Sequence, residues 1–578
     1  MSDQPLLMDE TSVDQESLPM PRYSFSRLFP IYGANLYTSD LPLQQVLKFF
    51  NTAASSEKVL QDVGQIAGTE VLEVADYVDR LARPLLHQSD VWGQRMDWVR
   101  IAPAHQNLLD RLLSLGIVYR TFRDQGAWPL HYAMGYLVSD PGLYCTLTVT
   151  NQTAYGIFKY GAADLRERFL PHYLEQDGRK AWFGATYYTE TQGGSDLGAN
   201  RAQARPDGGR WQINSVDKYF TSNVGLADAA LVTARPEGAP AGPRGLALFL
   251  VPALREDGSP NYRIRRLKEK LATRAVPTGE VEMEDAEAYL LGEASQGIYL
   301  ALEVLSVARL ANAVGALGNA RKAQLAAYAY AKKRHTFGRS LVEHPLIQKD
   351  LLEMELLLQG NLLLAFYAVD RFQAVWQQTP PYSPEFWYAR FLNHLSKNVT
   401  AQAGVEITRR AMEMWGGIGF MEDFPLARFH REALVMPIWE GGSHIQALDM
   451  LETLVRKQVH QHWREDMVER LNGLASASEA GRLAGQALEK GWQQIQQVLQ
   501  ASPHQAQYQA GQLLNRLAQI TAAVLYLQWA EQQAERLAEV PWNVLAESFL
   551  RWQLHGRAPA ATLAEKVAEL YSVLFPGL

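Results

Sequence analysis

A single carboxylate, Glu440, stands between an apolar run and two glycines in the stretch 435–449, which reads VMPIWEGGSHIQALD. Glycine lets the backbone approach a ligand closely, and the ring of Trp439 would keep water away from the carboxylate. Such a carboxylate is a stronger base than the same group in water. We expect Ser443 to be the N-cap of the helix that follows. The simpler alternative is a helix-entry turn whose glutamate points to solvent.

A second group of residues with chemical potential lies at 182–196, where the pattern changes from helical to strand-like. Gly194 and Ser195 belong to a Gly-Gly-Ser turn, and backbone N–H groups in such a turn suit a pyrophosphate. The hydroxyls of Thr189 and Ser195 can hydrogen-bond to a heterocycle carbonyl or to a phosphate. A glycine-rich turn between strands explains the same residues without a ligand.

An aromatic residue and a hydroxyl lie two places apart in the predicted strand 217–223. Positions i and i+2 of a strand share a face, so Phe220 could cover a flat ring while Ser222 hydrogen-bonds to its edge. Cross-strand packing explains the pair equally well. The stretch 142–155, which is apolar and rich in threonine, could line a cavity, but helix packing explains most of it.

Two arginines, Arg309 and Arg334, belong to one long predicted helix. They are separated by 25 residues, close to seven turns, so they point the same way but lie about 37 Å apart. One small ligand cannot contact both. Arg334, Thr336 and Phe337 offer a cation, a hydroxyl and a ring that suit an adenine nucleotide. A cation at a helix C-terminus followed by Gly338 explains the same residues more simply.

Gly416 and Gly417 follow another predicted helix end, where glycine is expected in any case. A phosphate-holding role cannot be separated from a plain helix stop on the local sequence. We expect no metal site, because no group of His, Cys, Asp and Glu has metal-ligand spacing. A Ser-His-Asp arrangement is not evident either.

The whole chain limits the settings in which these residues act. Its 578 residues, 47% hydrophobic and 20% charged, indicate several domains. The single cysteine, Cys145, excludes an internal disulfide and fits a reducing compartment. The net charge of −7 argues against a general affinity for nucleic acid. We find no apolar run of about 18 residues and no basic segment before an apolar core. We therefore expect a cytoplasmic protein without a membrane span or export signal.

The elements that must position these side chains indicate an α+β fold that is mostly helical. Short apolar runs separated by Pro-Asp-Gly-Gly, Pro-Glu-Gly and Asp-Gly predict strands in the middle of the chain. Helical periodicity predicts helices over 40–182, and further helices at 296–334, 345–376, 385–414 and 443–468. The predicted regions are a disordered acidic leader (1–22), an N-terminal helical domain (23–182), a middle β-barrel-like domain (183–292), a C-terminal four-helix bundle (293–457) and an extra helical region (458–578).

The order and spacing of five motifs resemble those of the flavin-dependent acyl-CoA dehydrogenases. These are Thr-Glu-Xaa-Xaa-Gly-Gly-Ser-Asp, the aromatic–hydroxyl strand, Arg-Xaa-Thr-Phe-Gly, Gly-Gly-Ile-Gly-Phe and Trp-Glu-Gly. The resemblance covers about 115–457. The segments 35–40 and 99–103 and the extra C-terminal region look more like the AidB-like, DNA-alkylation-response branch of that family.

The resemblance implies an FAD-dependent enzyme that dehydrogenates an acyl-CoA thioester between its α and β carbons. Glu440 matches the base that removes the α-proton, and the β-carbon hydride would pass to flavin N5. Residues that match positions near the substrate are Ser195, Arg309, Trp439 and Gly441. Residues that match cofactor-binding positions are Thr189, Gly194, Ser195, Phe220, Ser222, Arg334, Thr336, Phe337, Gly416, Gly417, Gly442 and His444.

Some positions depart from the family pattern. Gly442 and His444 stand where the family commonly has Thr and Gln near the adenosine. Glu413 replaces a common Gln before the glycine pair, and Ser306 stands where some relatives have an Asp near CoA. FAD binding is therefore expected to be retained but locally altered.

The resemblance also implies partners. An electron-transfer flavoprotein or a similar acceptor would take the electrons, and a homo-oligomer, dimer or tetramer, would complete the adenine end of the FAD site. The alternative is an AidB-like stress-response flavoprotein with weak dehydrogenase activity and possible nucleic-acid binding. From Arg456 onward, however, 11 Lys+Arg face 11 Asp+Glu, so this region lacks the charge that phosphate binding requires. A nitroalkane oxidase is disfavoured because such relatives usually have Asp at the position of Glu440.

Overall fold

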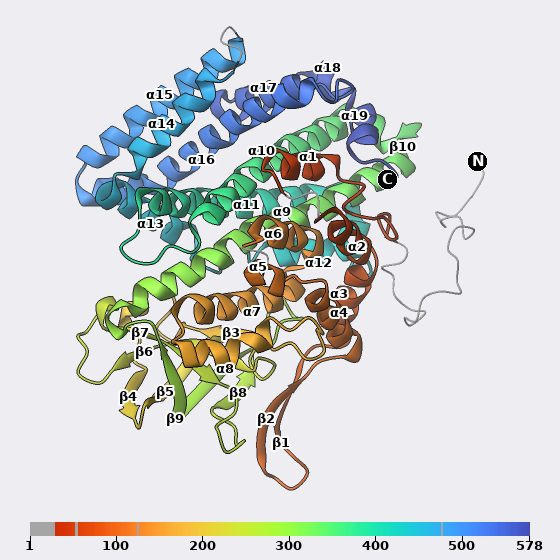
Figure 1. The fold of residues 1–578 in the computed structure, drawn as a ribbon. Helices are drawn as coiled ribbons and strands as arrows, with labels where there is room; N and C mark the ends of the chain where they lie inside the picture. The colour runs from red at the N-terminus through yellow and green to blue at the C-terminus, as the bar shows by residue number, and fades with distance from the viewer. Residues whose placement is uncertain (1–28, 53–55, 124–125, 475–477) are drawn as a thin grey trace.

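The computed structural model describes residues 29–52, 56–123, 126–474 and 478–578 (Figure 1). The predicted acidic leader, 1–22, lies outside the described residues. Helices form the upper layers of the molecule in Figure 1, and the strands of a β domain lie below them. The prediction of a mostly helical α+β fold with a middle β domain is confirmed.

The described residues between 29 and 182 form eight helices and one hairpin. The helices are α1 (Leu41–Phe49), α2 (Glu57–Ala67), α3 (Glu70–Arg80), α4 (Pro103–Ser114), α5 (Tyr119–Arg123), α6 (Trp128–Val138), α7 (Pro141–Tyr160) and α8 (Ala163–Tyr173). Pro141 occupies the first turn of α7, where a missing N–H costs nothing, and the Asp140 side chain caps the helix by accepting from the Leu143 N–H.

The expectation of helices throughout 40–182 is wrong at one place. Strands β1 (Leu85–Ser89) and β2 (Arg95–Arg100) pair antiparallel and project from the body at the bottom of Figure 1. In β2, Asp97 and Val99 are buried and their neighbours exposed, which is the alternation of a strand. The hairpin is held on the β domain because Gln88 and Arg95 both donate to the Ile264 carbonyl.

The middle of the chain forms a sheet that closes on itself. Its strands are β3 (Gly184–Tyr187), β4 (Gln203–Asp207), β5 (Arg210–Ser222), β6 (Ala229–Pro236), β7 (Ala247–Pro252), β8 (Arg263–Leu267) and β9 (Thr278–Leu291). The strand order is β3-β6-β4-β5-β9-β7, β8 pairs with β9, and β6 also pairs with β7. Because β6 meets β7, the path β6-β4-β5-β9-β7 is a closed barrel whose interior is a separate apolar core.

Long helices form the bundle that follows: α9 (Gly297–Lys333), α10 (Pro345–Val375), α11 (Pro384–Trp415) and α13 (Ser443–Lys457), with α12 (Pro425–Ala433) before the last of them. The first three agree closely with the predicted ranges. The predicted helix 443–468 is in fact two helices, because Gln458 adopts a left-handed conformation, with φ 52°, between α13 and α14 (Val459–Asn472). No proline or glycine marks this break in the sequence.

Two of these helices qualify as membrane spans by length and composition, which corrects the expectation that no segment is apolar enough. They are the helical segment 294–333, which contains α9, and α10. Of the most apolar 18-residue window of each, 89% and 94% of the residues are buried inside the protein. Both are therefore core helices, whose apolar surface is already covered by neighbouring elements.

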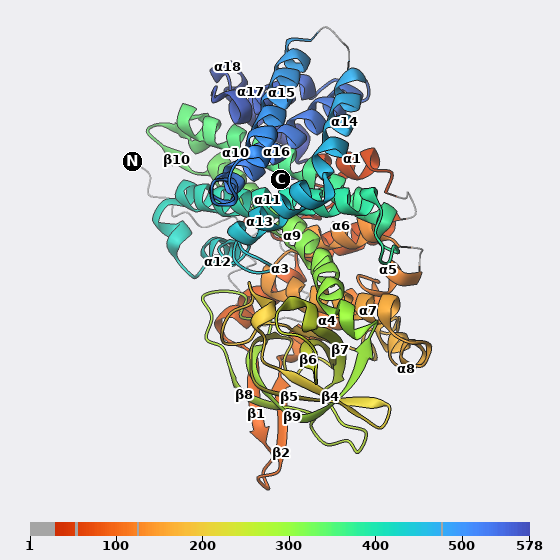
Figure 2. The same cartoon turned by 90° about the vertical axis from the view of Figure 1, so that its left-hand side faces the viewer.

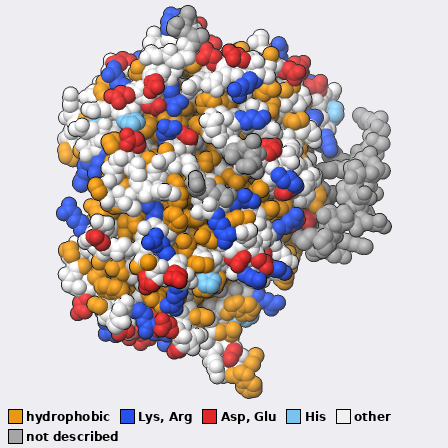
Figure 3. Space-filling view, in the orientation of Figure 1, with side chains coloured by type: hydrophobic (Ala, Val, Ile, Leu, Met, Phe, Trp, Pro, Cys, Tyr) orange, Lys and Arg blue, Asp and Glu red, His pale blue; other side chains and the backbone are white. Residues whose placement is uncertain are grey.

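The C-terminal helices are α15 (Glu479–Gln500), α16 (Pro503–Ala534), α17 (Trp542–His555), α18 (Ala561–Ala564) and α19 (Val567–Leu574). Helix α16 packs on α10, α11 and α13, so the extra region forms a layer on the bundle away from the barrel (Figure 2). Tyr571 ties the end of the chain to the bundle, donating to the Leu351 carbonyl and accepting from Gln324. On the face in Figure 3, acidic and basic side chains of the described residues are interspersed.

Candidate active site

Glu440 lies in the loop between α12 and α13, which crosses the bundle between α9 and α11. Its backbone is left-handed, with φ 56°, and Gly441 follows at φ 90°. Such a conformation is uncommon for a residue with a side chain and persists only where the surroundings enforce it. Gly442 occupies the N-cap of α13 and Ser443 is its first residue, so the expectation of a Ser443 N-cap is wrong.

Four hydrogen bonds hold the two carbonyls of this turn. The Glu440 carbonyl accepts from Arg309 Nε at 3.0 Å and from Gln446 Nε2 at 3.1 Å. The Gly441 carbonyl accepts from Lys397 Nζ at 2.9 Å and again from Gln446 Nε2 at 2.9 Å. Because these donors come from α9, α11 and α13, three helices enforce the left-handed turn. Its conformation is a product of the tertiary fold.

One face of α9 holds the rest of the loop and helix α12 before it. Asn312 and Asn319, three and ten residues after Arg309, donate to the carbonyls of Met436 and Phe429 at 3.1 and 2.8 Å. These positions lie on the same side of a helix with 3.6 residues per turn. Arg309 also forms an ion pair of 3.1 Å with Asp449 on α13. The loop between α12 and α13, residues 434–442, is named the base loop. Side chains of α9 that donate to main-chain oxygens hold it along that helix.

The surroundings of Glu440 change its acidity. Burial raises the pKa of the Glu440 carboxyl to about 7, and the charges of Arg309 and Lys397 oppose this rise. Burial disfavours the charged form of a carboxyl group and therefore makes it a stronger base. A proton acceptor with a pKa near neutrality is well suited to general base catalysis.

Two residues that the sequence did not single out as site residues lie near this carboxylate. Cys145 of α7 and Tyr188, just after β3, are both close enough for the charge of Glu440 to raise their pKa values further, beyond the main effect of burial. The Ser222 side chain acts in the opposite direction and lowers the pKa of the Cys145 thiol. Helix α7 therefore brings part of the stretch 142–155 to the site.

Trp439 packs against an apolar cluster of Cys145, Val149 and Val276 and against a second cluster that includes Met436. The first two lie at positions i and i+4 of α7, so one face of that helix meets the indole. The Trp439 Nε1 atom is buried and has no hydrogen-bond partner among the described residues. An apolar wall is thus built beside Glu440.

The residues predicted to contact a flat heterocycle come from two adjoining segments. Phe220 and Ser222 lie at the end of β5, and the Tyr219 N–H donates to the Thr189 carbonyl at 2.9 Å, which places the segment after β3 beside them. The Phe220 side chain is 54% exposed. A Cβ atom at Gly194 would lie 2.5 Å from Thr189 Oγ1, so glycine is needed for this close approach.

A buried ion pair shapes the loop 190–202, which contains Gly194 and Ser195. Glu190 accepts from Lys218 Nζ at 2.8 Å, and both side chains are fully buried. The Glu190 carboxylate also accepts from the N–H groups of Arg201 and Ala202 at 2.6 and 3.2 Å. Fully paired in this way, the carboxylate fixes both ends of the 190–202 loop, at whose exposed surface Ser195 lies.

The other predicted cofactor residues lie at the far end of α9. Arg334 is the C-cap of that helix, and Thr336 and Phe337 follow in a tight turn, with Phe337 97% exposed. Trp415, the residue before Gly416 and Gly417, stacks on Tyr330 of α9 with ring centroids 4.5 Å apart. The five residues Arg334, Thr336, Phe337, Gly416 and Gly417 therefore share one end of the bundle, seven helical turns from Arg309. The structure does not bring them to Glu440 of the same chain.

Gly442 and His444 lie on the Glu440 side. Gly442 is half-buried in the turn, and His444 is exposed in the first turn of α13. Lys397 and Gln446 are the two other donors to the turn at Glu440 and Gly441. Neither is marked by a proline or glycine pattern in the sequence. The signal that marks Lys397 is a lysine inside an otherwise buried stretch of α11. The sequence did not single out either residue.

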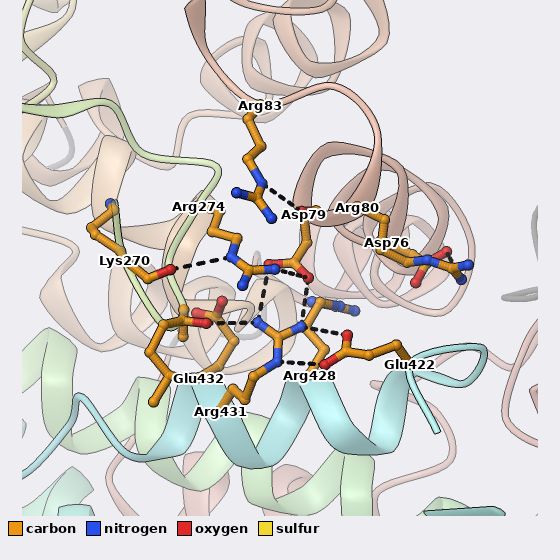
Figure 4. Close-up of polar contacts among 12 residues, drawn as sticks. Asp76, Asp79, Arg80, Arg83, Lys270, Arg274, Glu422, Arg428, Arg431 and Glu432 are labelled. Atoms are coloured by element: carbon orange, nitrogen blue, oxygen red, sulfur yellow. Dashed lines mark hydrogen bonds and ion pairs between the residues drawn. The ribbon is translucent and has the colours of Figure 1, made fainter. Parts of the chain in front are cut away.

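A polar cluster joins three parts of the chain just before the base loop (Figure 4). Asp79 of α3 accepts from Arg431 of α12 at 2.6 Å and from Arg274, in the loop between β8 and β9, at 3.4 Å. Glu432, next to Arg431, accepts from the N–H groups of Gly142 and Thr273 at 3.1 and 2.6 Å. Helix α12 is thereby fixed to the N-terminal helices and to the barrel before the chain reaches Glu440.

The site fits the flavin group that the sequence resemblance implies. A half-exposed aromatic face at Phe220 adjoins the hydroxyls of Ser222 and Thr189, and a glycine turn opens beside them. The buried Tyr188 hydroxyl has no hydrogen-bond partner among the described residues. This donor set, a ring with hydroxyls at its edge and backbone N–H groups beyond, suits an isoalloxazine with a pyrophosphate tail.

Comparison with protein-family models finds three matches that together span most of the chain. Residues 29–177 match the adaptive response protein AidB N-terminal domain. Residues 185–286 match the acyl-CoA dehydrogenase middle domain, and residues 295–455 match the acyl-CoA dehydrogenase C-terminal domain.

Among curated proteins, the putative acyl-CoA dehydrogenase AidB of Escherichia coli (strain K12) is 32% identical over 449 residues, which are 74% of this chain and 80% of that protein. Among solved structures, Caenorhabditis elegans ACDH-11 in complex with C11-CoA has a TM-score of 0.80 at 24% identity, covering 94% of this chain and 95% of that one. Bacillus anthracis acyl-CoA dehydrogenase complexed with FAD has a TM-score of 0.73 at 17% identity, covering 95% and 93%. These two structural likenesses show a shared fold.

Proposed function

This chain belongs to the acyl-CoA dehydrogenase family and is an FAD-dependent oxidoreductase, and we propose that it dehydrogenates an acyl-CoA thioester with Glu440 as the base. The observation that supports this best is the setting of Glu440, a carboxylate with a pKa of about 7 in a turn held by three helices. An apolar wall headed by Trp439 lies beside it.

FAD, when bound, supplies the acceptor for the hydride that leaves the β-carbon. Phe220, Ser222 and Thr189 would hold the isoalloxazine, and the turn of Gly194 and Ser195 would hold the pyrophosphate. The protein's part is to bind and orient these groups and to exclude water from the reacting carbons. Trp439, packed on Cys145 and Val149, does the latter.

The proton chemistry rests on Glu440. In its carboxylate form, an oxygen of Glu440 takes the α-proton of the thioester and becomes a neutral carboxyl group. Burial favours that neutral product, while Arg309 and Lys397 keep the carboxylate accessible near pH 7. A backbone N–H aimed at the thioester carbonyl would stabilise the charge that develops there. The enforced turn at Glu440 and Gly441 is suited to present such an N–H.

The remote residues suit a site shared between subunits. Arg334, Thr336 and Phe337, with Gly416 and Gly417, would bind the adenine half of an FAD whose flavin lies in a neighbouring copy. The exposure of Phe337, and of Phe420 and Met421 beyond the glycines, supports a protein partner at this end of the bundle. We therefore propose a homo-oligomer, a dimer or a tetramer, that works in the cytoplasm with an electron-transfer flavoprotein or a similar acceptor.

The test is anaerobic titration with acyl-CoA thioesters from short to long chains, followed by flavin absorbance. The wild-type flavin should bleach, and the flavin of a Glu440→Gln variant should not. Glu452→Gln is the matched control, because Glu452 is an exposed α13 residue paired only with Arg456 among the described ion pairs. Equal bleaching of wild type and Glu440→Gln would remove Glu440 from the role of base.

A second candidate is supported by the match of residues 29–177 to the AidB N-terminal domain. It is a stress-response flavoprotein with weak dehydrogenase activity and nucleic-acid binding. Duplex DNA binding that falls steeply with salt would support it. The neutral balance of the C-terminal region argues for weak binding with a shallow salt dependence.

A further inference from the structure

We propose that Lys397 is a positioning residue for the base, whose ammonium both fixes the turn at Gly441 and supplies the positive charge that keeps Glu440 available as a carboxylate. The inference rests on the proposed role of Glu440 as the base. It assigns to a buried lysine of α11 a part in the reaction that the sequence motifs do not include.

The ammonium is buried without a counter-ion. Lys397 is 1% exposed, and the one hydrogen bond of its side chain in the described structure is the 2.9 Å contact of Nζ with the Gly441 carbonyl. None of the ion pairs among the described residues includes it. Burying an unpaired charge is costly, and the Gly441 carbonyl is the hydrogen-bond acceptor that the described structure gives this ammonium. Burial lowers the pKa of the Lys397 ammonium to about 7, and the negative charge of Glu440 opposes this fall. Lys397 is therefore mostly charged on the acidic side of pH 7, which is where the titration of Glu440 limits the rate.

The other groups around Glu440 leave Lys397 as the uncompensated charge. Arg309, on α9, has the larger effect on Glu440, but Asp449 of α13 lies 3.1 Å from its guanidinium and offsets it. Cys145 of α7 stays a neutral thiol, since burial raises its pKa to about 12. Tyr188 also stays neutral, because burial raises its pKa well above its ordinary value.

Titratable groups that lie further from Glu440 do not replace the positive charge of Lys397. His394 lies on α11 one turn before Lys397 and hydrogen-bonds to Gln446, and burial lowers its pKa to about 3, so the ring is neutral. The charge of Arg390 interacts with the charges of Asp449 and Arg309. Lys270 and Glu432 interact electrostatically with each other and with the Cys145 thiol. Removing the ammonium of Lys397 therefore removes the unpaired positive charge next to the base.

The test uses the full-length holoenzyme with Lys397→Met, Lys397→Gln and Lys397→Arg. Lys490→Met is the matched control, because Lys490 is exposed on α15. The readouts are flavin content, the thermal midpoint, and the pH dependence of flavin reduction by an acyl-CoA. The charge of Lys397 lowers the pKa of Glu440, and a nearby opposite charge typically lowers a carboxyl pKa by about one unit or more. In Lys397→Met, the acidic limb of the pH–rate profile for flavin reduction should therefore move to higher pH by about one unit or more. In Lys397→Arg, the acidic limb should stay near that of the wild type.

Lys397→Gln separates charge from hydrogen bonding, because an amide can still donate to the Gly441 carbonyl. If the acidic limb of Lys397→Gln shifts as it does in Lys397→Met, the charge of Lys397 is supported as the cause. If Lys397→Gln binds flavin fully and its acidic limb does not shift, the role of the charge is overturned. If the Met variant fails to fold, the Gln variant decides alone.

A second readout does not depend on turnover. Infrared difference spectra against Glu440→Gln report the protonated carboxyl of Glu440 directly, and its titration should move upward in the Met and Gln variants. An unmoved titration overturns the role of Lys397. Flavin reduction that survives Glu440→Gln would instead overturn the proposed function, so the two failures are distinguishable.

Discussion

Arg309 Nε lies 3.0 Å from the main-chain carbonyl of Glu440, 131 residues further along the chain, and donates a hydrogen bond to it. The arginine thus acts on the backbone of the base and, through its charge, on the pKa of its side chain. Because Asp449 holds the same guanidinium at 3.1 Å, the orientation of Arg309 is fixed from α13 as well as from α9.

The rate of flavin reduction should depend on pH through Glu440. The pKa of Glu440 is about 7, above its ordinary value, so the carboxyl is neutral below that pH and the active carboxylate dominates above it. The second-order rate constant for flavin reduction at low substrate concentration, which reports the pKa of the free enzyme, is expected to rise about tenfold per pH unit on the acidic side and to level off above about pH 7. Anaerobic stopped-flow measurements from pH 5 to 9 test this. A flat profile would contradict the assignment.

Gln446→Leu should damage the turn without removing a charged group. Gln446 donates to the carbonyls of both Glu440 and Gly441, so the substitution leaves each with one donor fewer. Loss of hydrogen bonds to buried acceptors costs about 1–3 kcal/mol, and a misplaced base lowers kcat about 10- to 100-fold. Steady-state kinetics and flavin content measure this. The exposed Gln500→Leu, at the end of α15, is the control.

Glu432→Gln should loosen the junction between the three parts of the chain. The Glu432 carboxylate accepts from the Gly142 and Thr273 N–H groups, and an amide can satisfy only one of them through its oxygen without rearrangement. We expect a loss of about 2 kcal/mol in the free energy of unfolding. Denaturant unfolding measures it. Glu422→Gln provides a comparison, because Glu422 is half exposed, and it should cost less than about 1 kcal/mol.

Phe337→Ser should weaken FAD retention more than it weakens folding. The ring is almost fully exposed in the single chain, so its loss removes little from the core. If it covers the adenine of a neighbouring copy's FAD, the variant should lose flavin on dilution or gel filtration while its far-UV spectrum stays unchanged. Tyr508→Ser, at an equally exposed ring of α16, should retain flavin. Equal flavin retention by both variants would argue against a shared site.

Much of this molecule follows from local sequence. The α+β class and the ranges of α9, α10 and α11 come from periodicity and turn residues, which are properties of short segments. Glu440 and the glycines beside it stand out because their residue types are rare in combination. The separation of Arg309 from Arg334 follows from helix geometry alone.

Local signals failed where the outcome depends on distant partners. The break at Gln458 has no glycine or proline, the hairpin β1–β2 is stabilised by the carbonyl of Ile264, and the N-cap of α13 is Gly442 because the turn before it is held by other helices. The apolar windows of α9 and α10 could not be read as core rather than membrane segments before their neighbours were placed.

The sequence by itself determined which chemical groups the chain has and in what order, because residue type and local periodicity need no distant contact. Only the tertiary structure decided which of them act together. Lys397, Gln446, Cys145 and Tyr188 reach Glu440 from four different segments. A pKa near 7 arises only when burial is combined with the charges of Arg309 and Lys397. Acidity and strain depend on distances in space, and those distances exist only once the helices are packed.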